Sequence, residues 1–127
     1  MKNLSKYIGI PFIDNGRTLE GCDCFGLVKL IYKEQFNIIL PDYLYKDTND
    51  IEAINDSLSV GKNMYEKVNS PLYGNLVLFN IVGMPMHIGF CLGHGKFLHV
   101  SNKSKTSCKD RILRWKNKIE GFYCYVR

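Results

Sequence analysis

The chain has 127 residues, 46% of them hydrophobic, and a formal net charge of +5 at pH 7. This length suits a compact domain that can bury a hydrophobic core, and the aromatic content excludes a disordered chain. The positive charge is compatible with an anionic partner such as nucleic acid, a membrane surface or cell-wall polymer, but selects none of them. We therefore expect a single domain over residues 1–127.

The N-terminal segment "MKNLSKYIGIPFIDNGR" lacks the apolar stretch of a signal peptide, and no apolar run is long enough to span a bilayer. We thus expect a protein made in the cytoplasm, with no membrane insertion. Five cysteines are an odd number, and Cys22 and Cys24 are too close to bridge without strain. A disulfide framework of the secreted kind is therefore not expected.

The first predicted element is a helix from about Cys24 to Gln35. Asp23 occupies the N-cap position, and Asn37 is a plausible terminator. Apolar residues follow helical spacing along this segment, at Cys24, Leu27, Val28, Ile31 and Phe36. A second helix is predicted from about Asp50 to Met64, where Ile51, Ile54 and Leu58 form one stripe.

From Asn75 onward the pattern changes to short aromatic and β-branched runs. These runs are "LVLFNIV", "HIGFCL", "KFLHV" and "EGFYCYV", divided by turn residues and by one basic segment. Such spacing predicts an antiparallel sheet. Helices followed by strands indicate an α+β domain, with the sheet packed on the first helix.

A cysteine at the start of a helix is a candidate nucleophile. Unpaired amides and the helix dipole stabilise an anion there, so Cys24 is expected to have a lowered pKa, and its own amide would face a developing oxyanion. Gly26 would leave room for an approaching substrate. The alternative is that small residues in "GCDCFG" simply pack closely against the sheet, and the hexapeptide alone favours that alternative.

The histidines decide between these interpretations, because a thiol nucleophile needs a base and an orienting group. His87 opens one predicted strand and His99 lies in the next, while His94 sits in a glycine turn and is expected to be solvated. The separation of His87 and His99 is even, so an odd-length loop around His94 would place both side chains on one face. His87 would then deprotonate Cys24, and His99 would hold the ring of His87 in the useful tautomer.

Two other kinds of site compete with this one. Cys22, Cys24 and the histidines are suitable zinc ligands, but C-x-C without a second cysteine pair is a poor match to structural zinc sites. The segment "SNKSKTSCKDRILRWKNK" is basic and carries a tryptophan, as in nucleic-acid-binding surfaces. More often such a run is a solvated loop leading to an edge strand, or it meets an anionic glycan or teichoic acid. We expect no metal and no specific nucleic acid.

In order and spacing, "GCDCFGLVKLIY", "YGNLVLFN" and "HIGFCLGHGKFLHV" resemble the NlpC-type cell-wall cysteine peptidases, a papain-like family that cuts peptide stems of peptidoglycan. The opening "YIGIPFIDNGRTLEGCDCFGLV", followed by "LPDY", is most similar to the branch found in bacteriophage tails and tail-derived particles. The resemblance runs from about Tyr7 to Val100. It implies an α+β papain-like fold, with an N-terminal helix that carries the nucleophile packed on a C-terminal antiparallel sheet.

By this resemblance Cys24 matches the family nucleophile, His87 the general base and His99 the polar residue that orients it. Many members have a tyrosine near the active site where this chain has Phe12, which cannot donate a hydrogen bond. Tyr7 or a backbone group would then take its place, or the oxyanion would be held more weakly. Asp23 belongs to the same neighbourhood, whereas Cys22 has no role that carries over.

The resemblance implies a peptidase that hydrolyses peptidoglycan stem peptides between D-glutamate and the diamino acid, without a cofactor. Its location would be the bacterial cell wall, within a phage tail or tail-like particle whose other proteins are partners. Two alternatives stay open. One is an inactive structural or peptidoglycan-binding module, and the other is an amidase or acyltransferase that uses the same thiol.

Overall fold

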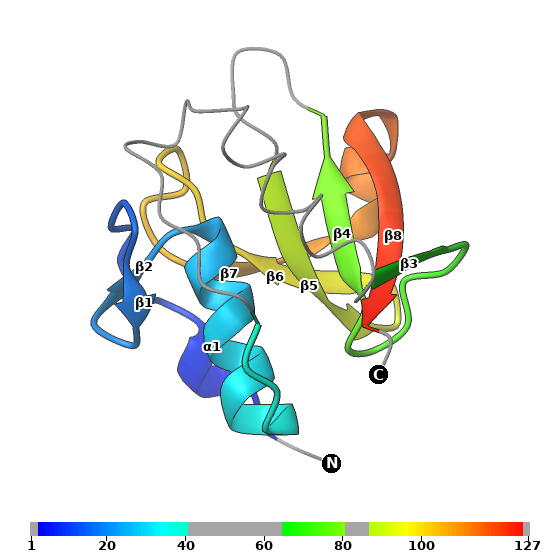
Figure 1. Cartoon of the computed structure of the whole chain (residues 1–127). Coiled ribbons are helices and arrows are strands. Elements are labelled where there is room, and N and C mark those ends of the chain that lie inside the picture. Colours follow the sequence, from blue (N-terminus) through cyan, green and yellow to red (C-terminus); the bar gives the residue numbers. More distant parts are fainter. Residues whose placement is uncertain (1–2, 41–64, 81–86, 126–127) are drawn as a thin grey trace.

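The structure is a computed structural model, and it describes residues 3–40, 65–80 and 87–125 (Figure 1). In these ranges one α-helix, α1 (Cys24–Phe36), packs on a six-stranded antiparallel sheet. The strands of the sheet are β3 (Tyr65–Val68), β4 (Leu76–Phe79), β5 (His87–Gly93), β6 (Lys96–His99), β7 (Cys108–Arg111) and β8 (Ile119–Tyr125). The predicted α+β class, with a helix packed on an antiparallel sheet, is confirmed.

Helix α1 begins and ends where the sequence predicts. The backbone of Asp23 is extended, and its carboxylate accepts a hydrogen bond from the Gly26 amide at 2.7 Å, so Asp23 is the N-cap. Asn37 adopts a left-handed conformation with φ of 56°, and its amide donates to the Tyr32 carbonyl, which ends the helix. The second predicted helix, about Asp50 to Met64, lies outside the described residues.

The sheet has the strand order β3-β8-β4-β5-β6-β7. The four apolar runs of the sequence form β4, β5, β6 and β8, which confirms those predictions. The sequence did not predict β3 and β7, because "YEKV" and "CKDR" are too polar to stand out. The prediction that the basic segment is a loop leading to an edge strand is wrong. That segment itself contains the edge strand β7 and a 3-10 helix, η2 (Ile112–Lys118), and β8 beyond it is internal.

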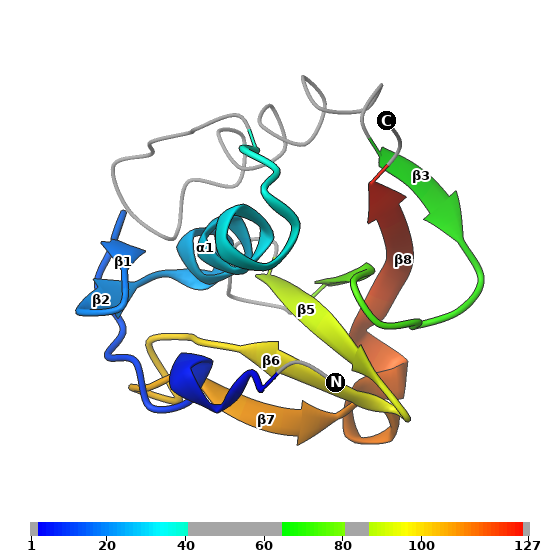
Figure 2. The ribbon, with the colours of Figure 1, turned by 90° about the horizontal axis from the view of Figure 1, so that it is seen from below.

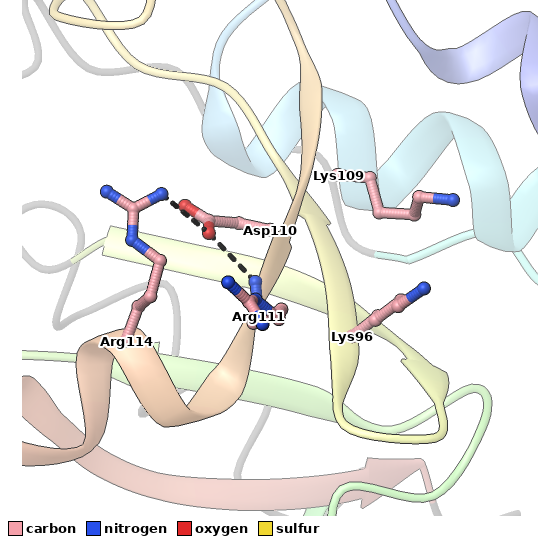
Figure 3. Close-up of a pocket in the computed structure, with 5 residues that line it drawn as sticks. All are labelled: Lys96, Lys109, Asp110, Arg111 and Arg114. Atoms are coloured by element: carbon pink, nitrogen blue, oxygen red, sulfur yellow. Dashed lines mark hydrogen bonds and ion pairs between the residues drawn. The ribbon is translucent and has the colours of Figure 1, made fainter.

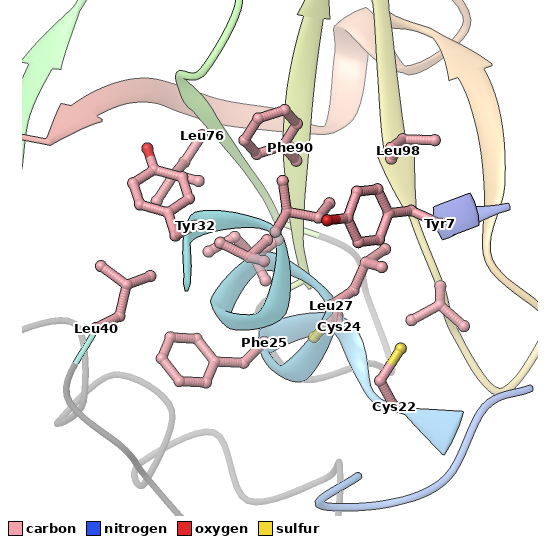
Figure 4. Close-up of a cluster of buried hydrophobic side chains, with 14 of the residues drawn as sticks. Tyr7, Cys22, Cys24, Phe25, Leu27, Tyr32, Leu40, Leu76, Phe90 and Leu98 are labelled. Atoms are coloured by element: carbon pink, nitrogen blue, oxygen red, sulfur yellow. The ribbon is translucent and has the colours of Figure 1, made fainter. Parts of the chain in front are cut away.

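Side chains alternate between two buried layers on the two faces of the sheet. The helix face, which packs against α1, carries Leu78 and Ile88, together with Leu76, Phe90 and Leu98, which are labelled in Figure 4. The far face carries Val77, Phe79, Cys91 and Phe97, with Trp115 of η2 packed against them. Since successive residues of a strand point to opposite faces, the buried positions 87–91 of β5 and 97–99 of β6 alternate between the two layers.

The N-terminal segment is held against the sheet next to β7. A short 3-10 helix, η1 (Ser5–Tyr7), lies beside β6 and β7 in Figure 2. Ser107 attaches it, because its hydroxyl donates to the Tyr7 carbonyl at 2.6 Å and its carbonyl accepts from the Gly9 amide at 2.8 Å. A two-stranded hairpin, β1 (Arg17–Thr18) and β2 (Gly21–Cys22), then leads directly into α1. Within the described ranges, no helix has the length and apolar character needed to cross a membrane.

Candidate active site

Cys24 is the first residue of α1, and its position is set by the charged network around Asp23. The fully buried Asp23 carboxylate accepts hydrogen bonds from the Asn15 amide at 2.9 Å and the Arg17 guanidinium at 3.0 Å, besides the Gly26 amide. Arg17 also donates to the Gly16 carbonyl at 2.9 Å. These bonds tie the β1–β2 hairpin to the start of the helix, and they hold Cys24 where the two elements meet.

The Cys24 thiol is buried, and burial raises its pKa to about 12. The negative charge of Asp23 raises the pKa further, whereas backbone hydrogen bonds from Ile88 and Phe25 and the charge of Arg17 lower it. The prediction of a lowered pKa is therefore wrong. The physical reason is that removing the thiolate from water, next to a carboxylate, costs more than the helix start returns.

His87 and His99 lie in contact on the far face of the sheet. Their rings join through His87 Nε2 and His99 Nδ1 at 2.9 Å, and both side chains are buried. The pair packs among aromatic rings, with Phe79 5.4 Å from His87 and Trp115 5.6 Å from His99, measured between ring centroids. The prediction that both histidines share one face of the sheet is confirmed.

The hairpin that joins the two strands achieves this parity in a different way from the one predicted. The turn has two residues, His94 and Gly95, both with positive φ, rather than an odd number. An irregularity between Cys91 and Gly93 supplies the extra residue, because Cys91 pairs with Phe97 while Gly93 pairs with Lys96. Without this bulge, His99 would point to the helix face. His94 is exposed at the tip, as expected.

The thiol and the histidine pair approach the beginning of β5 from opposite faces. Cys24 belongs to the helix-face core and contacts the backbone of Ile88, while the neighbouring residue, His87, projects to the far face. No hydrogen bond between Cys24 and His87 is present among the described residues. The structure thus brings both groups to one end of one strand, and in this conformation the thiol is not bonded to the imidazole.

Both imidazoles are neutral at neutral pH. Burial, followed by the nearby His99, lowers the pKa of His87 to about 3. Burial also lowers the pKa of His99, although the Asp110 carboxylate opposes that effect. A neutral imidazole can accept a proton, so the pair is in the protonation state that a general base requires.

The other residues predicted at the site have different surroundings. The Tyr7 hydroxyl donates to Glu34 at 2.6 Å and accepts from Gln35 at 3.0 Å. Those partners lie ten and eleven residues along α1 from Cys24, about 15 Å or more at the rise of an α-helix, so the structure does not bring the Tyr7 hydroxyl to the thiol. Phe12 is half-buried and pairs with Cys22 in an isolated bridge.

Gly26 does not face open space for a substrate. A Cβ atom added to it would lie 1.9 Å from the Gly16 carbonyl oxygen, so the glycine allows α1 to pack against the hairpin. This corrects the predicted role.

Cys22 is a buried core residue, and burial raises the pKa of its thiol to about 12. All five cysteines are free thiols.

The candidate zinc ligands considered from the sequence, which are Cys22, Cys24 and the histidines, are divided between the two faces of the sheet. Over residues 3–40, 65–80 and 87–125 no group of three or more histidine, cysteine or acidic side chains is arranged to hold a metal ion.

Sequence reasoning missed two residues that surround His99. Asp110 Oδ2 lies 3.4 Å from His99 Nε2, and Trp115 packs its ring against the same imidazole. Both belong to the basic segment, where a single aspartate among lysines and arginines carries no motif that would indicate a role. The register that places Asp110 opposite Phe97, and so on the face of His99, is visible only in the paired strands.

The basic segment also lines a shallow pocket of about 450 Å³ at the sheet edge (Figure 3). Its lining residues are Lys96, Lys109, Asp110, Arg111 and Arg114. Lys96 and Arg111 are directly opposite in the β6–β7 register, where like charges repel. The sequence-based observation of a basic surface thus corresponds to a real cationic edge, adjacent to the histidine pair.

The helix packed on an antiparallel sheet is a papain-like α+β fold, in which a cysteine starts the helix and two adjacent strands carry contacting histidines. The NlpC/P60 family model matches residues 9–119, and the chain belongs to this family.

Two curated relatives are similar over most of this chain. The murein DD-endopeptidase MepS/murein LD-carboxypeptidase of Escherichia coli (strain K12) is 28% identical over 104 residues, covering 82% of this chain and 49% of that protein. The gamma-DL-glutamyl hydrolase of Bacillus subtilis (strain 168) is 27% identical over 125 residues, covering 95% of this chain and 27% of that protein. The chain therefore spans about half, or less, of the length of these relatives.

Solved structures agree on the fold. The NlpC/p60 domain of the peptidoglycan hydrolase SagA aligns with a TM-score of 0.64 at 18% identity, covering 96% of this chain and 92% of that one. The peptidoglycan hydrolase RipB of Mycobacterium tuberculosis aligns with a TM-score of 0.65 at 18% identity, covering 94% of this chain and 59% of that one.

Proposed function

We propose that this chain is a cysteine peptidase that hydrolyses peptide bonds in the stem peptides of peptidoglycan. Membership of the NlpC/P60 family supports the proposal, as do relatives named as a murein endopeptidase and a gamma-DL-glutamyl hydrolase. The observation that carries it is the 2.9 Å contact of His87 with His99, at the strand position next to the one whose backbone contacts the Cys24 thiol.

In this proposal, Cys24 Sγ attacks the carbonyl carbon of the scissile bond and His87 takes the thiol proton. Because His87 Nε2 faces His99, only Nδ1 is left for the thiol. The tetrahedral intermediate expels the amine, which receives the proton from His87, and leaves a thioester on Cys24. Water activated by the same imidazole then releases the acid. The amide of Cys24 stabilises the oxyanion, and no cofactor takes part.

The neutral state of both partners has a consequence for the mechanism. With the pKa of Cys24 raised to about 12 and that of His87 lowered to about 3, a preformed thiolate–imidazolium pair is disfavoured in the unliganded protein. Proton transfer therefore accompanies attack on the substrate, as in general-base catalysis by a serine-type triad.

The proposed target is the bond between D-glutamate and the diamino acid. The sequence resemblance and the gamma-glutamyl specificity in the name of the Bacillus subtilis relative support it. A place in a phage tail or tail-like particle is proposed on the opening motif alone. Mass spectrometry of purified virions or particles from the encoding cells tests that part, and absence of the chain from them would reject it.

The experiment on function compares wild type with Cys24→Ala on purified peptidoglycan, with released fragments identified by mass spectrometry. We expect wild type to release stem fragments with a free N-terminal diamino acid, and Cys24→Ala to release none above background. Cys124→Ser is the matched control, because Cys124 is a half-buried thiol on β8, near Tyr32 and Phe36 at the far end of α1 from Cys24, and should keep full activity. Equal yields from wild type and Cys24→Ala would reject the mechanism.

A second candidate is a peptidoglycan-binding module without catalysis, which the burial of a protonated thiol favours. Binding of both proteins to peptidoglycan, with no fragments from either, would support this candidate. Transfer of the acyl group to an added amine rather than to water would instead identify an acyltransferase on the same thiol.

A further inference from the structure

Asp110 is the half-buried carboxylate next to the histidine pair. It lies on β7, diagonal to His99 across the β6–β7 register and on the same face of the sheet. Its Oδ2 accepts a hydrogen bond from Trp115 Nε1 at 2.9 Å, and its Oδ1 accepts from the Arg111 amide at 2.8 Å and from Arg114 at 3.2 Å. Figure 3 shows this carboxylate held between the two arginines.

These contacts keep Asp110 ionised. Burial by itself raises the pKa of a carboxyl group, but the hydrogen bonds from Trp115 and the Arg111 amide, together with the charge of Arg114, bring the pKa of Asp110 below its ordinary value. An ionised carboxylate can only accept hydrogen bonds. A polar group that faces the Asp110 carboxylate must therefore donate a hydrogen bond to it.

His99 Nε2 faces it. The nitrogen is buried and lies 3.4 Å from Asp110 Oδ2, longer than an ordinary hydrogen bond, and the described residues offer it no other polar partner. Trp115 fixes this approach from two sides, because it packs on the His99 ring and donates to the Asp110 oxygen that faces the ring.

We propose that Asp110 is a positioning residue that determines where the protons sit on both histidines. With Asp110 ionised, His99 carries its proton on Nε2, so its Nδ1 is an acceptor. His87 must then donate from Nε2 to that acceptor across the 2.9 Å contact. The lone pair of His87 is thereby left on Nδ1, the nitrogen that the proposed function assigns to the Cys24 thiol. The relay has four residues rather than three.

An amide in place of the carboxylate would move the proton of each imidazole ring from Nε2 to Nδ1. In Asp110→Asn, the NH2 group can donate to His99 Nε2, which transfers the His99 proton to Nδ1. His87 Nε2 would then become the acceptor, and its Nδ1 would carry a proton toward the thiol. Such a protein can fold normally and still lack a base, in the way that the asparagine variant of the Ser-His-Asp triad carries the wrong tautomer.

Nitrogen-15 NMR of protein labelled in the histidine rings tests the proton positions directly, without substrate. In wild type at neutral pH, His87 and His99 should both show a protonated Nε2 and an unprotonated Nδ1. A protonated Nδ1 on His99 in wild type would overturn the proposal, whether or not any variant folds. In Asp110→Asn both rings should change tautomer, and spectra unchanged from wild type would equally overturn it.

The catalytic consequence rests on the proposed function and has a separate readout. With a stem peptide as substrate, Asp110→Asn should lower kcat on the order of 100-fold and leave KM nearly unchanged, because Asp110 is two groups removed from the reacting atoms. Glu120→Gln is the matched control, since Glu120 bonds Tyr123 and Lys67 on the same sheet and should keep wild-type kcat. Correct tautomers in an inactive wild-type protein would reject the peptidase alone, whereas wild-type kcat in Asp110→Asn would reject the positioning role.

Discussion

Cys24 shows how burial outweighs the local field of a helix start. The backbone amides near the thiol do favour the anion, and the N-cap is formed as expected. The same N-cap residue, however, is an aspartate whose charge lies beside the sulfur, and the thiol is enclosed by the helix-face core. Asp23 therefore has two opposing effects, because it organises the helix start and disfavours the thiolate.

Asp23→Asn separates these two effects. The asparagine keeps an oxygen for the Gly26 amide but removes the charge, so the pKa of Cys24 should fall. At fixed pH near 8, alkylation of Cys24 by iodoacetamide should become roughly 3- to 10-fold faster, because the thiolate population changes tenfold when the pKa changes by one. Peptide mass spectrometry measures the rate at each cysteine.

Cys91 is the internal control for that measurement. It is buried too, and burial alone raises the pKa of its thiol to about 12, with no contribution from Asp23. Its rate should therefore stay unchanged in Asp23→Asn. A parallel acceleration of Cys24 and Cys91 would mean that the variant loosens the whole protein, and would count against an electrostatic effect.

At the scale of elements, α1 packs closely against the β1–β2 hairpin at Gly26. Helix propensity alone predicts that Gly26→Ala stabilises the protein by about 1 kcal/mol. The structure predicts the opposite sign, because the new Cβ would meet the Gly16 carbonyl, a backbone atom that cannot move alone. We expect a loss of about 2 kcal/mol in the free energy of unfolding, measured by urea denaturation.

Lys33→Ala, on the exposed side of the same helix, should change that free energy by no more than about 0.5 kcal/mol. A stabilised Gly26→Ala would show that the hairpin is not packed on the helix start as described.

The β5–β6 hairpin shows how much one irregular residue decides. Two strands with a two-residue turn would put His87 and His99 on opposite faces, and the bulge between Cys91 and Gly93 brings them together. Even spacing in the sequence therefore places the two histidines on one face only because the connection leaves an odd number of residues unpaired, which the bulge provides.

At the scale of the whole molecule, burying two neutral histidines makes stability depend on pH. The pKa of folded His87 is about 3 and its ordinary value is 6.5. As pH falls below 6.5, the unfolded chain takes up a proton that the folded protein refuses, so stability present above pH 6.5 is lost progressively toward pH 3. At pH 4.5 the loss from His87 should be roughly 2–3 kcal/mol relative to neutral pH.

Urea unfolding at pH 7 and pH 4.5 measures this loss, with His87→Gln and His94→Gln compared against wild type. The carboxyl groups titrate in all three proteins, so only differences between them matter. We expect His87→Gln to lose less stability at pH 4.5 than wild type, and His94→Gln, altered at an exposed turn, to match wild type. An equal acid loss in wild type and His87→Gln would show that His87 is not buried in its neutral form.

By itself, the sequence determined α1 with its N-cap and C-cap, the four apolar strands and the even spacing of the two histidines. These are local properties, because helical periodicity, alternation and turn residues act over a few positions. Only the tertiary structure decided that the Cys24 thiol is protonated, that the Gly16 carbonyl occupies the space a side chain on Gly26 would need, and that Asp110 lies next to His99. Each of these depends on desolvation or on strand register between segments far apart in the chain, which no short stretch of sequence records.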